Sequence, residues 1–217
     1  MFLQLFEINP AAAVALIAGF VVGITIHEAA HAYSALKLGD DTAYRQGRVT
    51  LNPASHLDVL GSLMLLMAGF GWGRPTPVAV NRLKGGVFGP VAVAFAGPLS
   101  NLLIVFVCAG LYLLPPFQSG YLQVTLAAVA FVNALLFVFN LIPIPPLDGS
   151  KIIFPFFPRF LSPFVDFMNQ YGPFILIALV VASLLLNVPI LGVLLAPVYP
   201  LLFALGLGDA LIAMYGG

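Results

Sequence analysis

Two histidines and a glutamate stand close together in an apolar part of the sequence. They are His27, Glu28 and His31, in the run His27-Glu28-Ala29-Ala30-His31. Histidines four residues apart on a helix project from the same face one turn apart, as two ligands of one tetrahedral zinc ion require. Glu28 follows the first ligand and is placed to act as general base on a metal-bound water. The spacing therefore predicts a hydrolytic site with one Zn²⁺ per chain.

The composition places this site in a membrane protein. The 217 residues (23.0 kDa) are 61% hydrophobic and 7% charged, with a mean hydropathy of +1.08, whereas a soluble domain carries about 25% charged residues. Eight basic residues balance eight acidic ones, which excludes nucleic-acid binding driven by net charge. The lone Cys108 cannot form an internal disulfide. We expect one integral-membrane domain over 1–217.

The position of the histidines strengthens the functional interpretation. His27 lies about 17 residues into an apolar stretch that begins near Pro10. Ionisable groups inside a membrane span are costly and are therefore candidates for function. Two other interpretations stay open at this point: a buried polar cluster that holds helices together, and a proton or ion relay of the kind that transporters use.

A third ligand is needed, because a catalytic zinc ion is held by three protein ligands and keeps one position open. The candidate is Asp148, which follows the run Pro143-Ile144-Pro145-Pro146-Leu147. The prolines must break a helix, and broken backbone at membrane depth is tolerated only where protein or a water-filled cavity surrounds it. The alternative for Asp148 is a turn residue at the membrane interface.

Long segments without charge define the spans. The stretches 85–147 and 167–208 hold no Asp, Glu, Lys, Arg or His. A spanning helix needs about 20 apolar residues, so the pattern predicts an all-α polytopic protein. The expected spans are 10–38, 88–114, 121–142 and 171–187, with a further apolar stretch to about 207 that either crosses or re-enters.

The orientation follows from the basic residues. The apolar stretch from Val59 to Phe70 is too short to cross and should be re-entrant or interfacial. All eight Lys and Arg residues then fall on one face, which the positive-inside rule identifies as cytoplasmic. We therefore expect a multi-pass protein of the plasma membrane whose first helix runs inward. His31 and Asp148 then reach the same depth, and the active site lies toward the cytoplasm.

The connector between the first two long spans does not have a helical pattern. Arg48, Val49, Thr50 and Leu51 alternate polar and apolar, and Pro77–Asn81 is a second β-like run, so one or two short juxtamembrane strands are expected. The strand over 48–51 is a candidate for binding an unwound substrate by strand addition, or is a plain loop strand. His56 and Asp58, in the same connector, are either turn-capping residues or a second metal site.

Three separated motifs occur in the order found in a known family. They are His27-Glu28-Ala29-Ala30-His31, Gly97-Pro98-Leu99-Ser100-Asn101 and Asn140 through Pro146-Leu147-Asp148-Gly149. The chain thus resembles the site-2 protease family of intramembrane zinc metalloproteases. The resemblance covers a three-helix catalytic core over about 10–150, with additional C-terminal helices over about 151–217. Many relatives append a PDZ or paired regulatory domains, for which there is no room here, so the chain resembles a minimal member.

The resemblance implies specific roles. His27, His31 and Asp148 would bind zinc, Glu28 would be the catalytic glutamate, and Asn140 would hold the substrate or the developing oxyanion. The substrates would be transmembrane segments of membrane proteins, cut within the bilayer near the cytosolic side. The competing class is a non-proteolytic scaffold or transporter that retains the fold. The absence of further ionisable groups in the other predicted spans counts against transport.

Overall fold

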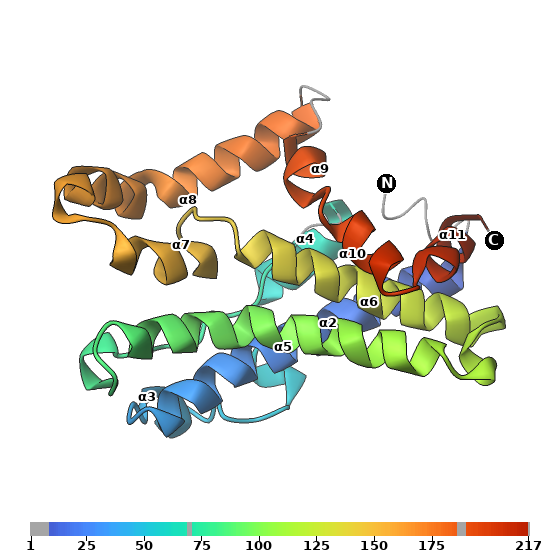
Figure 1. The fold of residues 1–217 in the computed structure, drawn as a ribbon, viewed down its shortest axis with the longest axis horizontal. Coiled ribbons are helices and arrows are strands. Elements are labelled where there is room, and N and C mark those ends of the chain that lie inside the picture. Colours follow the sequence, from blue (N-terminus) through green and yellow to red (C-terminus); the bar gives the residue numbers. More distant parts are fainter. Residues whose placement is uncertain (1–8, 69–70, 186–189, 217) are drawn as a thin grey trace.

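The protein is a bundle of long apolar helices joined by short helices and turns (Figure 1). The computed structural model describes residues 9–68, 71–185 and 190–216. The four long helices are α2 (Pro10–Lys37), α5 (Phe88–Tyr112), α6 (Gly120–Asn140) and α8 (Ser162–Leu185). The shorter ones are α3 (Thr42–Arg45), α4 (Val59–Ala68), α7 (Asp148–Ile153), α9 (Ile190–Leu195), α10 (Val198–Ala204) and α11 (Gly208–Gly216).

The ends of α2 follow from local sequence signals. The side chain of Asn9 accepts a hydrogen bond of 3.1 Å from the N–H of Ala12, and Pro10 occupies the first turn, where its missing N–H costs nothing. The helix stops before Gly39, whose φ of 105° lies in the left-handed region that favours glycine. These signals set the two ends of α2, the helix that carries His27 and His31.

Helices α2, α5 and α6 pack against one another as a three-helix core. Small residues make the contacts close: a β-carbon on Gly19 of α2 would lie 3.0 Å from the Cα of Val129 on α6. Close backbone approach is the main source of helix association in lipid, where no hydrophobic driving force acts between helices. On its other side α6 is covered by α10 and α11, which bury Leu202 and Met214 against the core.

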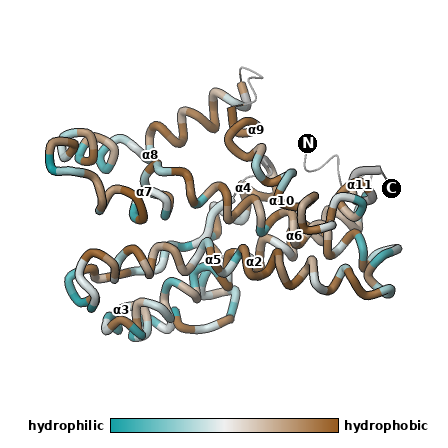
Figure 2. The backbone as a smooth tube through the Cα atoms, in the orientation of Figure 1, coloured by the Kyte–Doolittle hydropathy of each residue, from teal (hydrophilic) through white to brown (hydrophobic). Residues whose placement is uncertain are grey.

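The predicted spans agree with the long helices. In the described part of the chain four helices are long and apolar enough to cross a membrane, and Figure 2 shows apolar residues along them with polar residues mainly in the connections. Helix α8 begins at Ser162, earlier than the expected 171, because Pro163 fits the first turn and the following residues continue the helix. The apolar stretch to about 207 is interrupted around Pro197. Its helices α9 and α10 each rise only about 9–11 Å, too little to cross.

The prediction of short juxtamembrane strands is wrong, because the described residues of this connector form no strand. Arg48–Leu51 forms bends and irregular chain, and 77–81 ends in a short 3₁₀ helix over Val80–Arg82. The β-bridge found in this region joins Leu57 and Gly73. A ladder needs paired backbone groups, and two features remove them here: Pro75 and Pro77 have no N–H, and the carbonyl of Thr50 is taken by the ring of His56. Helix α4 rises about 15 Å, which is about half the thickness of the hydrocarbon core. This length agrees with the expectation that the stretch does not cross the membrane.

Candidate metal centre

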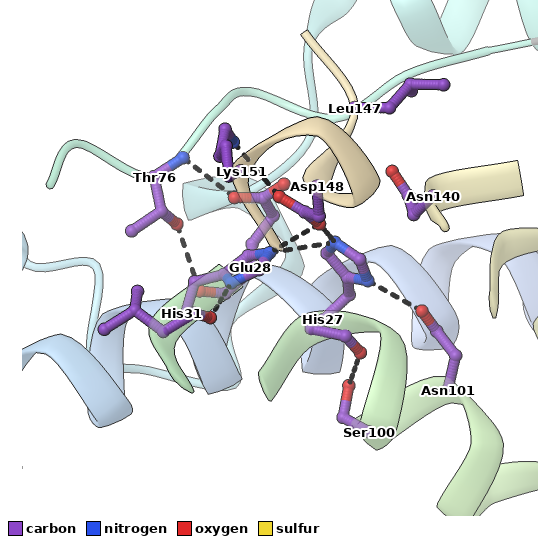
Figure 3. A network of polar contacts seen from close by, with 12 residues as sticks. His27, Glu28, His31, Thr76, Ser100, Asn101, Asn140, Leu147, Asp148 and Lys151 are labelled. Carbon is purple, nitrogen blue, oxygen red and sulfur yellow. Dashed lines mark hydrogen bonds and ion pairs between the residues drawn. The ribbon is translucent and has the colours of Figure 1, made fainter. Parts of the chain in front are cut away.

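Two histidines of α2 and one aspartate of α7 converge on a single point (Figure 3). The Nε2 atoms of His27 and His31 lie 3.0 Å apart, and Oδ2 of Asp148 lies 3.1 Å from each of them. The edge of a tetrahedron of zinc ligands is about 3.3 Å, given Zn–N and Zn–O distances of about 2.0–2.1 Å. All three side chains are buried. The triangle therefore has the dimensions of a zinc site.

The hydrogen bonds on the far side of the imidazoles show where their protons lie. Nδ1 of His31 lies 2.7 Å from the carbonyl oxygen of Val93, which can only accept, so Nδ1 carries the proton. Nδ1 of His27 lies 2.7 Å from Oδ1 of Asn101, whose amide nitrogen already donates to the Gly23 carbonyl and to Asn133. In the neutral rings both Nε2 atoms then present lone pairs to the Asp148 oxygen.

The three facing atoms of this triangle have the chemistry of a metal site. Three electron-rich atoms that face one another in a buried site repel unless a cation or a shared proton lies between them. Imidazole nitrogen and carboxylate oxygen are ligands that zinc binds in proteins, and three of them leave a fourth position open. The donor set of His27, His31 and Asp148 thus fits a catalytic zinc ion, and among the described residues it is the cluster that could hold one.

Asp148 reaches the site because α6 ends at Asn140 and the chain turns through its prolines. Gly149 permits this turn: a β-carbon there would lie 2.2 Å from the carbonyl oxygen of Leu141. Nζ of Lys151 lies 3.0 Å from Oδ1 of Asp148, so one carboxylate oxygen is held by the lysine while the other faces the histidines. The aspartate is thereby arranged to give a single oxygen to the site.

Helix α5 closes the site with a glycine. A β-carbon on Gly97 would lie 2.3 Å from Nε2 of His31 and 2.6 Å from Nε2 of His27. Only a residue without a side chain leaves room for these nitrogens and for an ion between them. The next residue, Pro98, has no N–H for the carbonyl of Ala94, which weakens the helix one turn before the site.

Glu28 lies beside this cluster on α2 and is 8% exposed. Its Oε2 accepts a hydrogen bond of 2.8 Å from the backbone N–H of Thr76. The hydroxyl of Thr76 donates to the main-chain carbonyl of Glu28 at 3.0 Å. The structure thus brings together four of the predicted residues, namely His27, Glu28, His31 and Asp148.

The other predicted residues are not part of the ligand triangle. Asn140 is partly buried at the end of α6 and donates back to the carbonyl of Leu136 at 2.9 Å. Val49, Thr50 and Leu51 line an apolar hollow of about 320 Å³ on a face of α2 different from that of His27 and His31. The hollow is completed by α2 residues: Ile26, Ala29, Ala30 and Tyr33.

The connector residues His56 and Asp58 have partners of their own. His56 is buried and donates from Nε2 to the carbonyl of Thr50 at 2.8 Å. The carboxylate of Asp58 accepts from the N–H of Gly61 at 2.8 Å and so caps the start of α4. These contacts match the turn-capping interpretation of Asp58, and the two side chains form no metal-binding group with a third ligand in the described ranges.

Three contacts of the site are not specified by the motifs alone: Asn101 with His27, Thr76 with Glu28, and Gly97 against the candidate ligands. Asn101 had a signal in the sequence, since a lone amide in a membrane span must find a polar partner. Thr76 had none, because its contact depends on how a 48-residue connection folds back.

Several known proteins are similar in sequence to this chain. YwhC of Bacillus subtilis, which is named a zinc metalloprotease, is 40% identical over 178 residues, or 78% of this chain and 81% of YwhC. The model of peptidase family M50 matches residues 115–183, which contain Asn140 and Asp148. This chain belongs to that family. Membership confirms the resemblance to the site-2 proteases and makes the protein a metalloendopeptidase.

More distant relatives of this M50 peptidase carry similar names. Rip2 of Mycobacterium tuberculosis (strain H37Rv), also named a zinc metalloprotease, is 34% identical over 147 residues, 65% of this chain and 57% of Rip2. MJ0611 of Methanocaldococcus jannaschii, with the same description, is 30% identical over 132 residues, 60% of this chain and 64% of MJ0611. No solved structure matches the chain significantly.

Proposed function

We propose that the protein is an intramembrane protease, which hydrolyses a peptide bond within or near the transmembrane segment of membrane-protein substrates. One observation carries the proposal: the triangle of His27, His31 and Asp148 is buried beside Glu28. The two histidines and Glu28 lie on α2, a helix long and apolar enough to cross the bilayer. A protease built for soluble substrates has no need to place its metal ligands along a membrane span.

Each residue of the site has its own proposed role in hydrolysis. One zinc ion per chain, held by His27, His31 and Asp148, would polarise the scissile carbonyl and make water acidic enough to ionise near neutral pH. Glu28 accepts the proton of the attacking water and passes it to the leaving amine, as a general base and then a general acid. Asn140 lies at the end of α6 close to the turn that carries Asp148, and its amide is proposed to leave the Leu136 carbonyl and hold the substrate or its developing oxyanion.

The substrate must be unwound before it is cut, because a helix hides its carbonyls in its own hydrogen bonds. The segment 48–51 is proposed to bind the unwound chain even though it forms no strand in this structure. Its position supports a variant of that role: Val49, Thr50 and Leu51 line the apolar hollow beside α2, which suits an apolar side chain of a transmembrane substrate.

We propose that the active site opens toward the cytoplasm of a plasma-membrane protein. The basic residues at the helix ends and connectors support this orientation. Lys37 ends α2, Lys84 precedes α5, and Lys151 lies in α7 next to Asp148. The positive-inside rule assigns such a face to the cytoplasm.

The experiment uses the full-length protein in vesicles with a panel of single-span peptides, and mass spectrometry locates each cut. The proposal predicts cuts inside the apolar segment, near its cytoplasmic end, that are abolished by a zinc chelator and by Glu28→Gln. Cuts confined to residues outside the apolar segment would contradict the intramembrane part. Full activity of Glu28→Gln would contradict the proposed base.

A further inference from the structure

The carboxylate of Glu28 is held by one residue from a distant part of the chain. The N–H of Thr76 donates to Oε2 at 2.8 Å, and the hydroxyl of the same threonine donates to the Glu28 main-chain carbonyl at 3.0 Å (Figure 3). These two contacts fix both ends of the Glu28 residue, its backbone and its carboxylate. The N–H of Thr76 holds Oε2 and leaves the other carboxylate oxygen, Oε1, outside this contact.

Thr76 is itself in a stiff segment. It stands between Pro75 and Pro77, whose rings fix φ and remove two backbone donors. A residue that precedes proline is restricted to extended backbone, so Thr76 has little conformational freedom to lose. Its N–H is the only backbone donor between Arg74 and Val78, and the fold directs it at Glu28.

The two ends of this segment are anchored to different parts of the connector. The N–H of Arg74 donates to the carbonyl of His56 at 2.7 Å, and the guanidinium of Arg48 donates to the carbonyl of Arg74. At the other end the N–H of Ala79 donates to Oδ2 of the buried Asp40 at 2.6 Å. Thr76 is therefore placed by contacts on both sides and does not rely on Glu28 to hold it.

We infer that Thr76 is a positioning residue for Glu28, an inference that rests on the proposed role of Glu28 as the base. Its N–H selects one rotational position of the carboxylate, and its hydroxyl ties the α2 backbone at Glu28 to the 74–79 segment. Oε1 is then presented to the water at the His27, His31 and Asp148 site. A preorganised base contributes to the rate of the chemical step and not to substrate binding.

The test compares Thr76→Val and Thr76→Ser with the native full-length protein, on a single-span peptide that the native protein cuts. Thr76→Val keeps the shape of the side chain and removes the hydroxyl bond to the Glu28 carbonyl. We expect kcat to fall about 10-fold, with KM and bound zinc unchanged. Thr76→Ser retains the hydroxyl and should restore kcat to within about 3-fold of native. Thr125→Val, which removes a hydroxyl bonded only to its own helix at Tyr121, is the matched control and should leave kcat unchanged.

Other results overturn the inference. They are an unchanged kcat in Thr76→Val, a loss of zinc or a rise in KM that accompanies the fall in kcat, and a Thr76→Ser variant no better than Thr76→Val. Glu28→Gln in the same assay separates the role of Glu28 as base from its positioning by Thr76. If Glu28→Gln is active, the proposed base is wrong. If it is inactive while Thr76→Val is fully active, the positioning role of the Thr76 hydroxyl is wrong.

Discussion

Asn101 on α5 fixes the orientation of His27 on α2, since Oδ1 of the amide lies 2.7 Å from Nδ1 of the ring. The amide nitrogen of Asn101 is held in turn by the Gly23 carbonyl and by Asn133 on α6. One buried amide therefore links all three core helices to His27, a candidate zinc ligand. Partners of this kind set the tautomer of a ligating histidine and raise its basicity.

Replacing Asn101 should weaken zinc binding without removing a ligand. We expect Asn101→Leu to lower zinc affinity about 10- to 100-fold, because His27 loses the acceptor that holds its proton on Nδ1. Competition with a chromogenic chelator measures this affinity. Ser100→Ala on the same helix is the control, as the Ser100 hydroxyl bonds only to the Gly97 carbonyl of α5. Equal zinc affinity of Asn101→Leu and the native protein would show that this contact does not act on the ligand.

Gly97 offers a way to block the site while every ligand stays in place. Gly97→Ala should abolish stoichiometric zinc binding, because its methyl group would lie 2.3 Å from Nε2 of His31. Gly110→Ala in the same helix adds a methyl group with nothing within 4 Å and should bind zinc normally. Metal analysis of the two purified variants makes the comparison. If Gly97→Ala bound one zinc with native affinity, the ion could not lie between the two histidines.

Removal of the metal should destabilise the protein. A ligand that binds only the folded state adds about 4 kcal/mol of stability at a thousand times its Kd. We expect a chelator to lower the Tm of the native protein by several degrees and to leave the Tm of Gly97→Ala unchanged. Thermal unfolding in detergent, followed by intrinsic fluorescence, measures both. An equal chelator effect on the two proteins would mean that the chelator acts elsewhere.

Asp40 anchors the 74–79 segment through the N–H of Ala79, and its titration should make the stability of the protein depend on pH. Burial raises the pKa of Asp40, but hydrogen bonds from Thr42 and from the N–H of Ala79 outweigh it and hold the pKa below its ordinary value. The stabilisation is thus fully present above about pH 4 and is lost as the pH falls through the lowered pKa. Asp40→Asn should lower the free energy of unfolding by about 1–3 kcal/mol at neutral pH, and the difference from native should shrink at low pH.

The exposed Asp166 on α8 gives the control for this effect. Thermal unfolding of native protein, Asp40→Asn and Asp166→Asn between pH 3 and pH 7 separates the buried carboxylate from general acid effects. We expect Asp166→Asn to follow the native protein throughout. A native-to-Asp40→Asn difference that does not change with pH would contradict the titration of Asp40 in this range.

The parts of the structure that depend on local pattern could be predicted from the sequence. Long stretches without charge set the spans, and a four-residue spacing set the faces of His27 and His31, because both signals are properties of one helix. Asp148 was within reach since few ionisable residues lie at the ends of predicted spans. Asn140 and the segment 48–51 stay predictions, as their proposed partner is the substrate.

Other features depend on contacts that the sequence does not encode locally. The alternation over 48–51 suggested a strand, yet a strand forms only where another strand pairs with it. Here Pro75 and Pro77 lack an N–H, and the His56 ring already donates to the carbonyl of Thr50. The partners Asn101 and Thr76 lie 74 and 48 residues from the groups they hold. Such pairs follow from the packing of α2 against α5 and the connector, and no single-segment pattern predicts them.

We propose that His27, His31 and Asp148 hold a zinc ion with which Glu28 performs peptide hydrolysis. The most direct measurement purifies native protein and Glu28→Gln side by side, quantifies zinc in each, and assays both on the same single-span peptide with and without chelator. We expect about one zinc per chain in both proteins, and chelator-sensitive cleavage by the native protein alone. Absence of bound zinc from both proteins, or cleavage by Glu28→Gln at the native rate, would contradict it.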